Sequence, residues 1–254
     1  MGTDTLETSE DAVLGGRLRL RQPLAGHRVG HDAILLAAAS EGRAGERALD
    51  LGAGVGAAGL ALAARVPGLS VTLVEIDPAL SALAGENARL NRLADRVNVL
   101  TADAEDGEAL VAAGLGGLDR VLTNPPFHDA SRQNVSPDPR RRLAHAGASG
   151  LLPRWIATAA RLLKPQGVLT LIWRADALAD VQAALAAAFA GISVLPVLPR
   201  ADAPAIRVLV RAVKSGTGAP RILPALVLND RHGKPTAAAE AVLRGAEALT
   251  LAEN

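Results

Sequence analysis

Residues 124–127 read NPPF, and these residue types together could hold an amino group beside an aromatic ring. The preceding apolar run, residues 121–123, has the composition of a strand, so the motif falls where that strand ends. Proline has no backbone N–H, so a turn with two prolines presents carbonyl oxygens, and the Asn124 side chain adds another acceptor. Acceptors directed at an exocyclic NH2 group would bind its hydrogens and leave the nitrogen lone pair free as a nucleophile.

Phe127 is one of two phenylalanines in a chain that has no tyrosine, and its ring could stack on a flipped base. Asn124, Pro125 and Phe127 are therefore candidate catalytic residues, with Pro126 and His128 as candidate substrate contacts. No strong general base is required, because a product ammonium can lose its proton after group transfer. His128 fits a position at the entrance better than the role of a base. The structural alternative is a rigid turn with a packed phenylalanine.

A glycine-rich turn predicts a site for a nucleotide-type cofactor. Residues 48–56 read ALDLGAGVG and lie where a first strand turns into a helix. Glycines let the backbone approach a ligand closely, and the helix N-terminus offers free N–H groups to an anionic group. Residues 54–59 also match G-x-G-x-x-G, with Glu75 at the end of the next strand. An oxidoreductase with a nicotinamide cofactor is therefore one alternative, and a plain glycine turn is another.

Acidic residues favour S-adenosylmethionine over a dinucleotide. Asp50 precedes the glycines, where a carboxylate would repel a pyrophosphate but could face the ammonium of a methionine moiety. Glu75 could accept from both ribose hydroxyls, and Asp103, after the third strand, could accept from the adenine amino group. We therefore predict cofactor contacts at Asp50, Gly52, Gly54, Glu75 and Asp103. Helix capping is the alternative for Glu75 and Asp103.

Short β-branched runs alternate with longer stretches rich in Ala and Leu, which predicts βαβ units and a doubly wound α/β fold with a parallel sheet. The expected strands are residues 47–51, 70–75, 97–100, 120–123, 167–173, 192–197 and 206–213. The expected helices are residues 31–40, 57–66, 78–90, 105–113, 151–163, 175–189 and 237–247. Ligands bind such sheets outside the carboxyl ends of the strands, and both motifs fall on that edge.

We expect one main domain over residues 15–213, after a flexible N-terminal extension at 1–14 and before a linker and helical tail at 214–254. Residues 128–149 form a long aperiodic loop, and such loops are more often functional or mobile than decorative. Four arginines in it could contact RNA phosphates, although a solvated charged face is an equal alternative. They are Arg132, Arg140, Arg141 and Arg142.

Composition excludes several classes of site. The chain of 254 residues has no cysteine, which excludes disulfides, thiolate metal sites and a cysteine nucleophile. The five histidines lack the spacing of metal ligands, so we predict no metal. The net charge of +1 does not by itself indicate a nucleic-acid partner. The chain shows neither an apolar run long enough for a membrane span nor a signal-peptide core, so a cytoplasmic protein without a membrane partner is expected.

Taken together, the motifs resemble class I S-adenosylmethionine-dependent methyltransferases that modify amino groups. More closely, the sequence is similar to the bacterial tRNA1(Val) adenine-N6 methyltransferase family over about residues 15–213. The similarity lies in ALDLGAGVG, NPPF and further segments: GGRLRLRQP (15–23), GHRVGHDAILLAA (26–38), VEID (74–77), ENA (86–88) and RLLKPQG (161–167). It implies a seven-stranded Rossmann-like sheet with its last strand antiparallel, and methylation of the exocyclic N6 of adenosine 37 in a tRNA partner.

The same resemblance implies that residues 30–32 close over the methionine end of the cofactor, which adds His31 and Asp32 to the cofactor site. Two features leave the target base open. The family's alternative aromatic residue, tyrosine, is absent, so Phe127 must provide all the stacking on the base. NPPFH also occurs in ribosomal RNA guanine-N2 methyltransferases, and the same chemistry methylates glutamine amides of proteins. Those two targets, and a non-catalytic RNA-binding module, remain alternatives.

Overall fold

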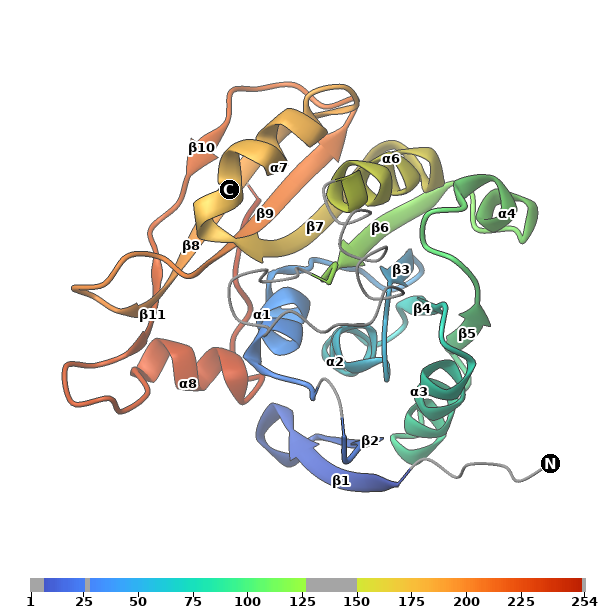
Figure 1. Cartoon of the computed structure of the whole chain (residues 1–254), viewed down its shortest axis with the longest axis horizontal. Helices are drawn as coiled ribbons and strands as arrows, with labels where there is room; N and C mark the ends of the chain where they lie inside the picture. The colour runs from blue at the N-terminus through green and yellow to red at the C-terminus, as the bar shows by residue number, and fades with distance from the viewer. Residues whose placement is uncertain (1–6, 26–27, 127–149, 253–254) are drawn as a thin grey trace, which may run out of the picture.

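A central sheet with helices on both faces forms the body of the molecule (Figure 1). The computed structural model describes residues 7–25, 28–126 and 150–252. Within these residues the sheet has nine strands: β3 (Arg47–Leu51), β4 (Ser70–Glu75), β5 (Val97–Thr101), β6 (Leu118–Thr123), β7 (Leu163–Arg174), β8 (Phe189–Arg200), β9 (Arg207–Lys214), β10 (Arg221–Ile222) and β11 (Leu226–Asn229).

The order of the strands confirms the predicted doubly wound fold. It runs β10-β8-β9-β7-β6-β3-β4-β5, with β11 also paired to β8. Strands β3 to β7 pair in parallel, whereas β9 runs antiparallel between β7 and β8. The seven strands β3 to β9 are those expected from the sequence, and β10 and β11 extend the sheet beyond them.

Two groups of helices bury the two faces of the sheet. One group contains α1 (His31–Ala39), α2 (Ala57–Arg65) and α3 (Pro78–Leu90). The other contains α4 (Gly107–Ala112), α6 (Leu151–Leu162) and α7 (Leu178–Leu185), with the 3-10 turn η3 (Ala175–Ala177) before α7. The core on each face is made mainly of leucine, valine and alanine, as the low aromatic content requires. None of the helices in the described ranges is long and apolar enough to cross a bilayer.

Local capping explains why some boundaries match the sequence prediction and others do not. α3 begins at Pro78 because Asp77 accepts hydrogen bonds from the first-turn amides of Ala79 (2.8 Å) and Leu80 (3.3 Å). α4 begins later than expected, because Asp106 caps it by accepting from the Ala109 amide at 2.9 Å. The helix expected over 175–189 stops at Leu185, since buried Phe189 already belongs to β8.

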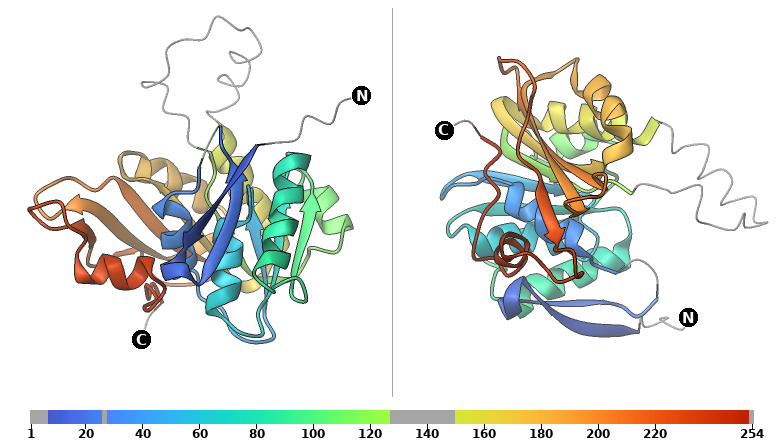
Figure 2. Two further views of the ribbon diagram at one scale, coloured as in Figure 1. Left: turned by 90° about the horizontal axis from the view of Figure 1, so that it is seen from below. Right: turned by 90° about the vertical axis from the view of Figure 1, so that its left-hand side faces the viewer.

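The N-terminal segment forms a hairpin where a flexible extension had been expected. β1 (Thr8–Val13) pairs antiparallel with β2 (Leu18–Pro23) through the 3-10 turn η1 (Leu14–Gly16). The hairpin lies outside the central sheet, with β2 against α2 and α3 (Figure 2). Leu18 and Leu20 alternate with arginines and are fully buried, which is why the segment is held in place.

The C-terminal segment is joined to the sheet rather than attached only by a helix. Residues expected to form a linker and tail supply β10 and β11, which both run parallel to β8. A further helix, α8 (Ala237–Leu243), packs against α1. Leu226 and Leu251 are buried, and the Leu249 amide donates to the Ala38 carbonyl at 2.8 Å. Burial of these leucines explains why the segment is ordered against the main domain.

Candidate active site

Strand register brings the candidate residues to one edge of the sheet. Leu51 of β3 lies between Val74 of β4 and Thr123 of β6. Glu75, the last residue of β4, lies beside Thr101 at the end of β5. The turns that follow these four strands therefore meet at the carboxyl edge, where ligands bind doubly wound sheets. The predicted residues that share this edge are Asp50, Gly52, Gly54, Glu75, Asp103 and Asn124.

The turn between β3 and α2 requires its glycines. Gly52 and Gly54 have φ values of 76° and 56°, which L side chains rarely adopt. The amides of Gly52 and Ala53 both donate to the Val74 carbonyl, at 2.9 and 2.8 Å, and fix the turn to β4. A Cβ placed on Gly54 would meet no atom of the described residues within 4 Å, so this side of the turn is open to a ligand.

Asp50 is a buried carboxylate, and among the described residues one amide donates to it. Its side chain is 2% exposed and accepts from the Gly59 amide at 2.7 Å. Burial raises the pKa of Asp50 to about 7, and the negative charge of Glu75 adds to this, against the opposing effect of the Gly59 hydrogen bond. Near neutral pH the two protonation states are therefore balanced, and a neighbouring cation would favour the ionised form.

Glu75 is held in a fixed orientation by two backbone donors. It is 8% exposed, its Oε2 accepts from the Gly54 amide at 2.8 Å, and its Oε1 accepts from the Asp77 amide at 2.9 Å. An ionised carboxylate has about four acceptor sites, so these bonds leave room for further donors such as hydroxyls. The capping role is taken by Asp77, so Glu75 is not the N-cap of α3.

Asp103 is exposed just after β5. Its Oδ1 accepts from the Glu105 amide at 2.8 Å, which closes a tight turn before α4. The cap of α4 is Asp106, so the capping alternative for Asp103 does not apply. Asp103 therefore stands at the same edge as Glu75 with one of its oxygens engaged in a local turn.

Asn124, directly after β6, carries a buried side-chain acceptor. The residue is half-buried, and its Oδ1 is buried with no hydrogen-bond partner among the described residues. The Thr123 hydroxyl donates to the Leu51 carbonyl at 2.9 Å and fixes the end of β6 to β3. Because a buried acceptor without a donor costs about 1–3 kcal/mol, Asn124 is poised for a donor from a ligand. Pro125 is buried and Pro126 exposed.

Six predicted substrate or catalytic residues lie outside the described residues. They are Phe127, His128, Arg132, Arg140, Arg141 and Arg142. Their roles remain predictions from the sequence.

The start of α1 carries the two residues expected to close over the methionine end of a cofactor. His31 is exposed and Asp32 is half-buried in the first turn of α1. Arg207 of β9 donates from Nε to Asp32 at 2.9 Å, so this carboxylate links α1 to the antiparallel strand. Asp32 thus fixes the position of the helix whose first residue is His31.

Trp155 of α6 belongs to the site and was missed by the sequence interpretation. A Cβ built on Gly52 would lie 2.2 Å from Cη2 of Trp155, so the indole packs directly on the glycine turn. The ring is 7% exposed, and its Nε1 is buried with no partner among the described residues. Tryptophan occurs only twice in the chain, and that scarcity was the available signal.

Across the described ranges, no group of three or more His, Asp or Glu side chains is placed to hold a metal ion.

Known proteins are similar to this chain in sequence and in fold. The methyltransferase small domain family matches residues 27–196. A tRNA1(Val) (adenine(37)-N6)-methyltransferase of Shewanella amazonensis is 30% identical over 221 residues, which cover 86% of this chain and 91% of that protein. The protein of the same name from Porphyromonas gingivalis is 36% identical over 159 residues, 61% of this chain, and the match spans only 62% of that relative's length.

Among solved structures, a predicted O-methyltransferase of Agrobacterium tumefaciens is 30% identical to this chain, with a TM-score of 0.73. The match covers 86% of this chain and 98% of that one. The glycine turn, the acidic residues at the strand ends and the NPP turn all lie within the matched range 27–196. This chain belongs to the methyltransferase small domain family.

Proposed function

We propose that the protein transfers a methyl group from S-adenosylmethionine to the exocyclic N6 of an adenine in tRNA. The observation that carries this proposal is the buried Oδ1 of Asn124, next to the strand that leads into the glycine turn, which has no hydrogen-bond partner among the described residues. A buried acceptor at the reactive end of a cofactor site suits a substrate that brings an N–H donor. An exocyclic amino group is such a donor.

The residues at the sheet edge fit the proposed cofactor in charge and in space. Asp50 would face the methionine ammonium, which favours its ionised form, and Glu75 would accept from the ribose hydroxyls. Gly52 and Gly54 let the backbone pass close to the ligand, and Asp103 would accept from the adenine amino group. His31 and Asp32 would cover the methionine end. When bound, S-adenosylmethionine supplies an electrophilic methyl group on its sulfonium.

The chain's own groups would prepare the amino nitrogen for attack. Asn124 Oδ1 would accept one hydrogen of the target NH2 group, and the carbonyl oxygen of Pro125 the other, which leaves the lone pair directed at the methyl group. Phe127 would stack on the flipped base, and Pro126 and His128 would line the entrance. The nitrogen would form a bond to the methyl carbon as the methyl–sulfur bond breaks with release of S-adenosylhomocysteine, and the ammonium product would release its proton to water.

The RNA substrate is inferred from the named relatives and from the basic loop. Arg132, Arg140, Arg141 and Arg142 would contact phosphates, which makes binding weaken steeply as salt rises. The reaction would take place in the cytoplasm, where tRNA is modified. A guanine N2 of ribosomal RNA and a glutamine amide of a protein offer the same NH2 donor and are the alternatives that the experiment must separate.

The test has two stages. Isothermal calorimetry with S-adenosylhomocysteine and with NADH identifies the cofactor, and binding of NADH alone would refute the proposal. Methyl transfer is then assayed with labelled S-adenosylmethionine and tRNA that lacks the modification. Mass spectrometry of the digested product should show N6-methyladenosine. Label found only in N2-methylguanosine of ribosomal RNA, or only in protein, would move the substrate to that alternative.

A further inference from the structure

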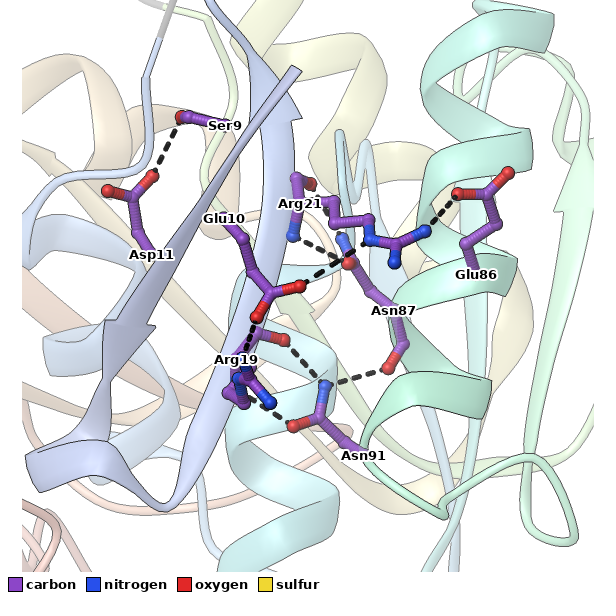
Figure 3. A network of polar contacts seen from close by, with 8 residues as sticks. All are labelled: Ser9, Glu10, Asp11, Arg19, Arg21, Glu86, Asn87 and Asn91. Atoms are coloured by element: carbon purple, nitrogen blue, oxygen red, sulfur yellow. Dashed lines mark hydrogen bonds and ion pairs between the residues drawn. The ribbon is translucent and has the colours of Figure 1, made fainter.

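The outer edge of β2 is paired with two side chains of α3 instead of with another strand (Figure 3). The Arg19 amide donates to Asn91 Oδ1 at 2.8 Å, and Asn91 Nδ2 donates back to the Arg19 carbonyl at 2.7 Å. Two residues along the strand, the Arg21 amide donates to Asn87 Oδ1 at 2.7 Å, and Asn87 Nδ2 donates to the Arg21 carbonyl at 2.9 Å. We call this pair, Asn87 and Asn91, the asparagine ladder.

The spacing of the asparagine ladder matches the strand that it binds. Residues four apart on a helix are separated by about 6 Å along its axis. Residues two apart on a strand are separated by about 6.6 Å. Asn87 and Asn91 can therefore offer one amide to each outward-facing backbone unit of β2, as a neighbouring strand would.

Asn87 makes one contact that Asn91 does not. Its Nδ2 also donates to the carbonyl of Val55, at 3.0 Å, and the side chain is fully buried. Val55 lies in the glycine turn between Gly54 and Gly56. One buried amide thus joins the docked hairpin to the turn where the cofactor is proposed to bind.

The hairpin also holds the segment that leads into α1. Gln22, 3% exposed, accepts from the Val29 amide at 2.8 Å and donates from Nε2 to Asp11 of β1 at 2.6 Å. Val29 precedes His31 by two residues. Of the two segments proposed to enclose the methionine end, the start of α1 is therefore held by β2 directly, and the glycine turn is joined to β2 through Asn87.

Ion pairs contribute little to this arrangement. Arg21 lies 3.6 Å from Glu10 and 3.5 Å from Glu86, and Arg19 pairs with Glu10, but the arginine side chains are 47% and 64% exposed. Exposed ion pairs of this kind are worth less than about 1 kcal/mol and are screened by salt. The amide bonds and buried Leu18 and Leu20 are what hold the hairpin.

We propose that Asn87 is a positioning residue that couples docking of the β1–β2 hairpin to the shape of the cofactor turn. The inference rests on the proposed function in that the glycine turn must bind the cofactor. Without Asn87 the Val55 carbonyl loses a buried donor, so the end of the turn around Val55 is held less firmly before binding, which weakens affinity. Coupling of this kind is reciprocal, so cofactor binding must also stabilise the docked hairpin.

The test compares Asn87→Ala with Asn91→Ala, since both remove one rung of the asparagine ladder but only the first also frees Val55. Affinity for S-adenosylhomocysteine is measured by calorimetry at low and at 0.5 M salt. We expect Asn87→Ala to bind about 10-fold more weakly at both salt concentrations, and Asn91→Ala to stay within about 2-fold of the parent. The KM for the cofactor should rise in Asn87→Ala while kcat at saturation stays the same.

Amide hydrogen exchange supplies the reciprocal measurement. S-adenosylhomocysteine should slow exchange of the Arg21 amide in the parent and in Asn91→Ala, and have no such effect in Asn87→Ala. Equal losses of affinity in the two variants would overturn the proposal. A parent protein that does not bind S-adenosylhomocysteine would instead refute the proposed function itself.

A second pair of variants covers the case in which Asn87→Ala fails to fold. Arg21→Pro removes the amide that donates to Asn87, and Arg19→Pro removes the one that donates to Asn91. Both amides point away from β1, so the pairing within the hairpin is kept. A loss of cofactor affinity in Arg21→Pro alone supports the coupling, and equal behaviour of the two overturns it.

Discussion

Asn124 is a residue whose side chain makes better sense with a ligand than without one. The fold places its Oδ1 out of contact with water and offers it no donor within the described residues. Natural proteins pair nearly all such atoms, so the exceptions tend to mark functional sites.

The first prediction separates these roles by replacing Asn124 with alanine. Methyl transfer should fall at least about 100-fold, because the amino group loses its acceptor, while the affinity for S-adenosylhomocysteine changes little. Stability against urea should stay the same or rise slightly, since an unpaired buried acceptor is removed. The exposed Asn98→Ala serves as control. Unchanged turnover in Asn124→Ala would show that the role is wrong.

Asp50 leads to a prediction about pH. Its pKa is raised to about 7 by burial, and the ionised form is the one that suits a cationic ligand. Affinity for S-adenosylhomocysteine should therefore rise about tenfold between pH 6 and pH 8 and then level off, and binding near pH 6.5 should release a proton. Calorimetry in buffers of different ionisation enthalpy measures both the affinity and the number of protons released. Asp50→Asn should bind S-adenosylhomocysteine weakly, with an affinity that does not change over this pH range.

The Asp50 carboxyl is also expected to make stability fall with rising pH, whereas the affinity for the ligand rises. The folded protein holds the Asp50 proton more tightly than the unfolded chain does. Protonation of Asp50 therefore adds to the free energy of unfolding in full below the unfolded pKa near 4, and this stabilisation is lost as pH rises through about 7. Urea unfolding of the ligand-free protein between pH 5 and pH 8 should show this decline, and Asp50→Asn should remove it. A ligand-free protein whose Asp50 contribution rises over that range would contradict the raised pKa.

At the scale of elements, the contact between α6 and the glycine turn decides how far the site can move. Trp155 fills the space beside Gly52, so the helix after the long loop and the cofactor turn are packed as one unit. A displacement of α6 would therefore move Trp155 relative to Gly52 and change the packing of the turn. The amides of Gly52 and Ala53 on Val74 hold the other side of the same turn against β4.

The next prediction contrasts Gly52→Ala with Gly54→Ala. Both positions have positive φ, which costs alanine about 1–2 kcal/mol. Only Gly52 would also force its Cβ into Trp155, so its loss of stability should exceed that of Gly54→Ala by about 1–3 kcal/mol. Urea unfolding of both variants gives the comparison. Adding Trp155→Leu should recover part of the loss in Gly52→Ala and none of it in Gly54→Ala.

At the scale of the molecule, the sheet and its C-terminal segment fold as one body. Leu251 is fully buried in the same core as α1 and α8, close to the Leu249–Ala38 hydrogen bond. We predict that Leu251→Ala lowers the free energy of unfolding by about 2–4 kcal/mol, in spite of its distance in sequence from every core strand. Ile222→Ala, at a side chain 72% exposed, should change it by less than about 0.5 kcal/mol. Equal effects would show that the segment is not part of the core.

The sequence predicts those parts of this molecule whose determinants are local. The seven core strands follow from apolar runs, the start of α3 follows from Asp77 and Pro78, and the position of the candidate site residues at the strand ends follows from short motifs. The hairpin escaped prediction because β1 is not an apolar run and β2 is held by α3, far along the chain. Trp155 and Asn87 escaped for the same reason, since each acquires its role from a turn that only the folded sheet brings near.

The path of the C-terminal segment has a consequence for synthesis on the ribosome. The residues that cover part of α1 and complete its core are made long after the helix itself, because the segment through Leu251 returns to the helix that begins at His31. A nascent chain can assemble β3 to β6 early, but the side of α1 that α8 covers stays exposed until translation has passed the C-terminal segment. The order of synthesis thus delays completion of the core around α1 until well after the strands that carry the proposed cofactor site have been made.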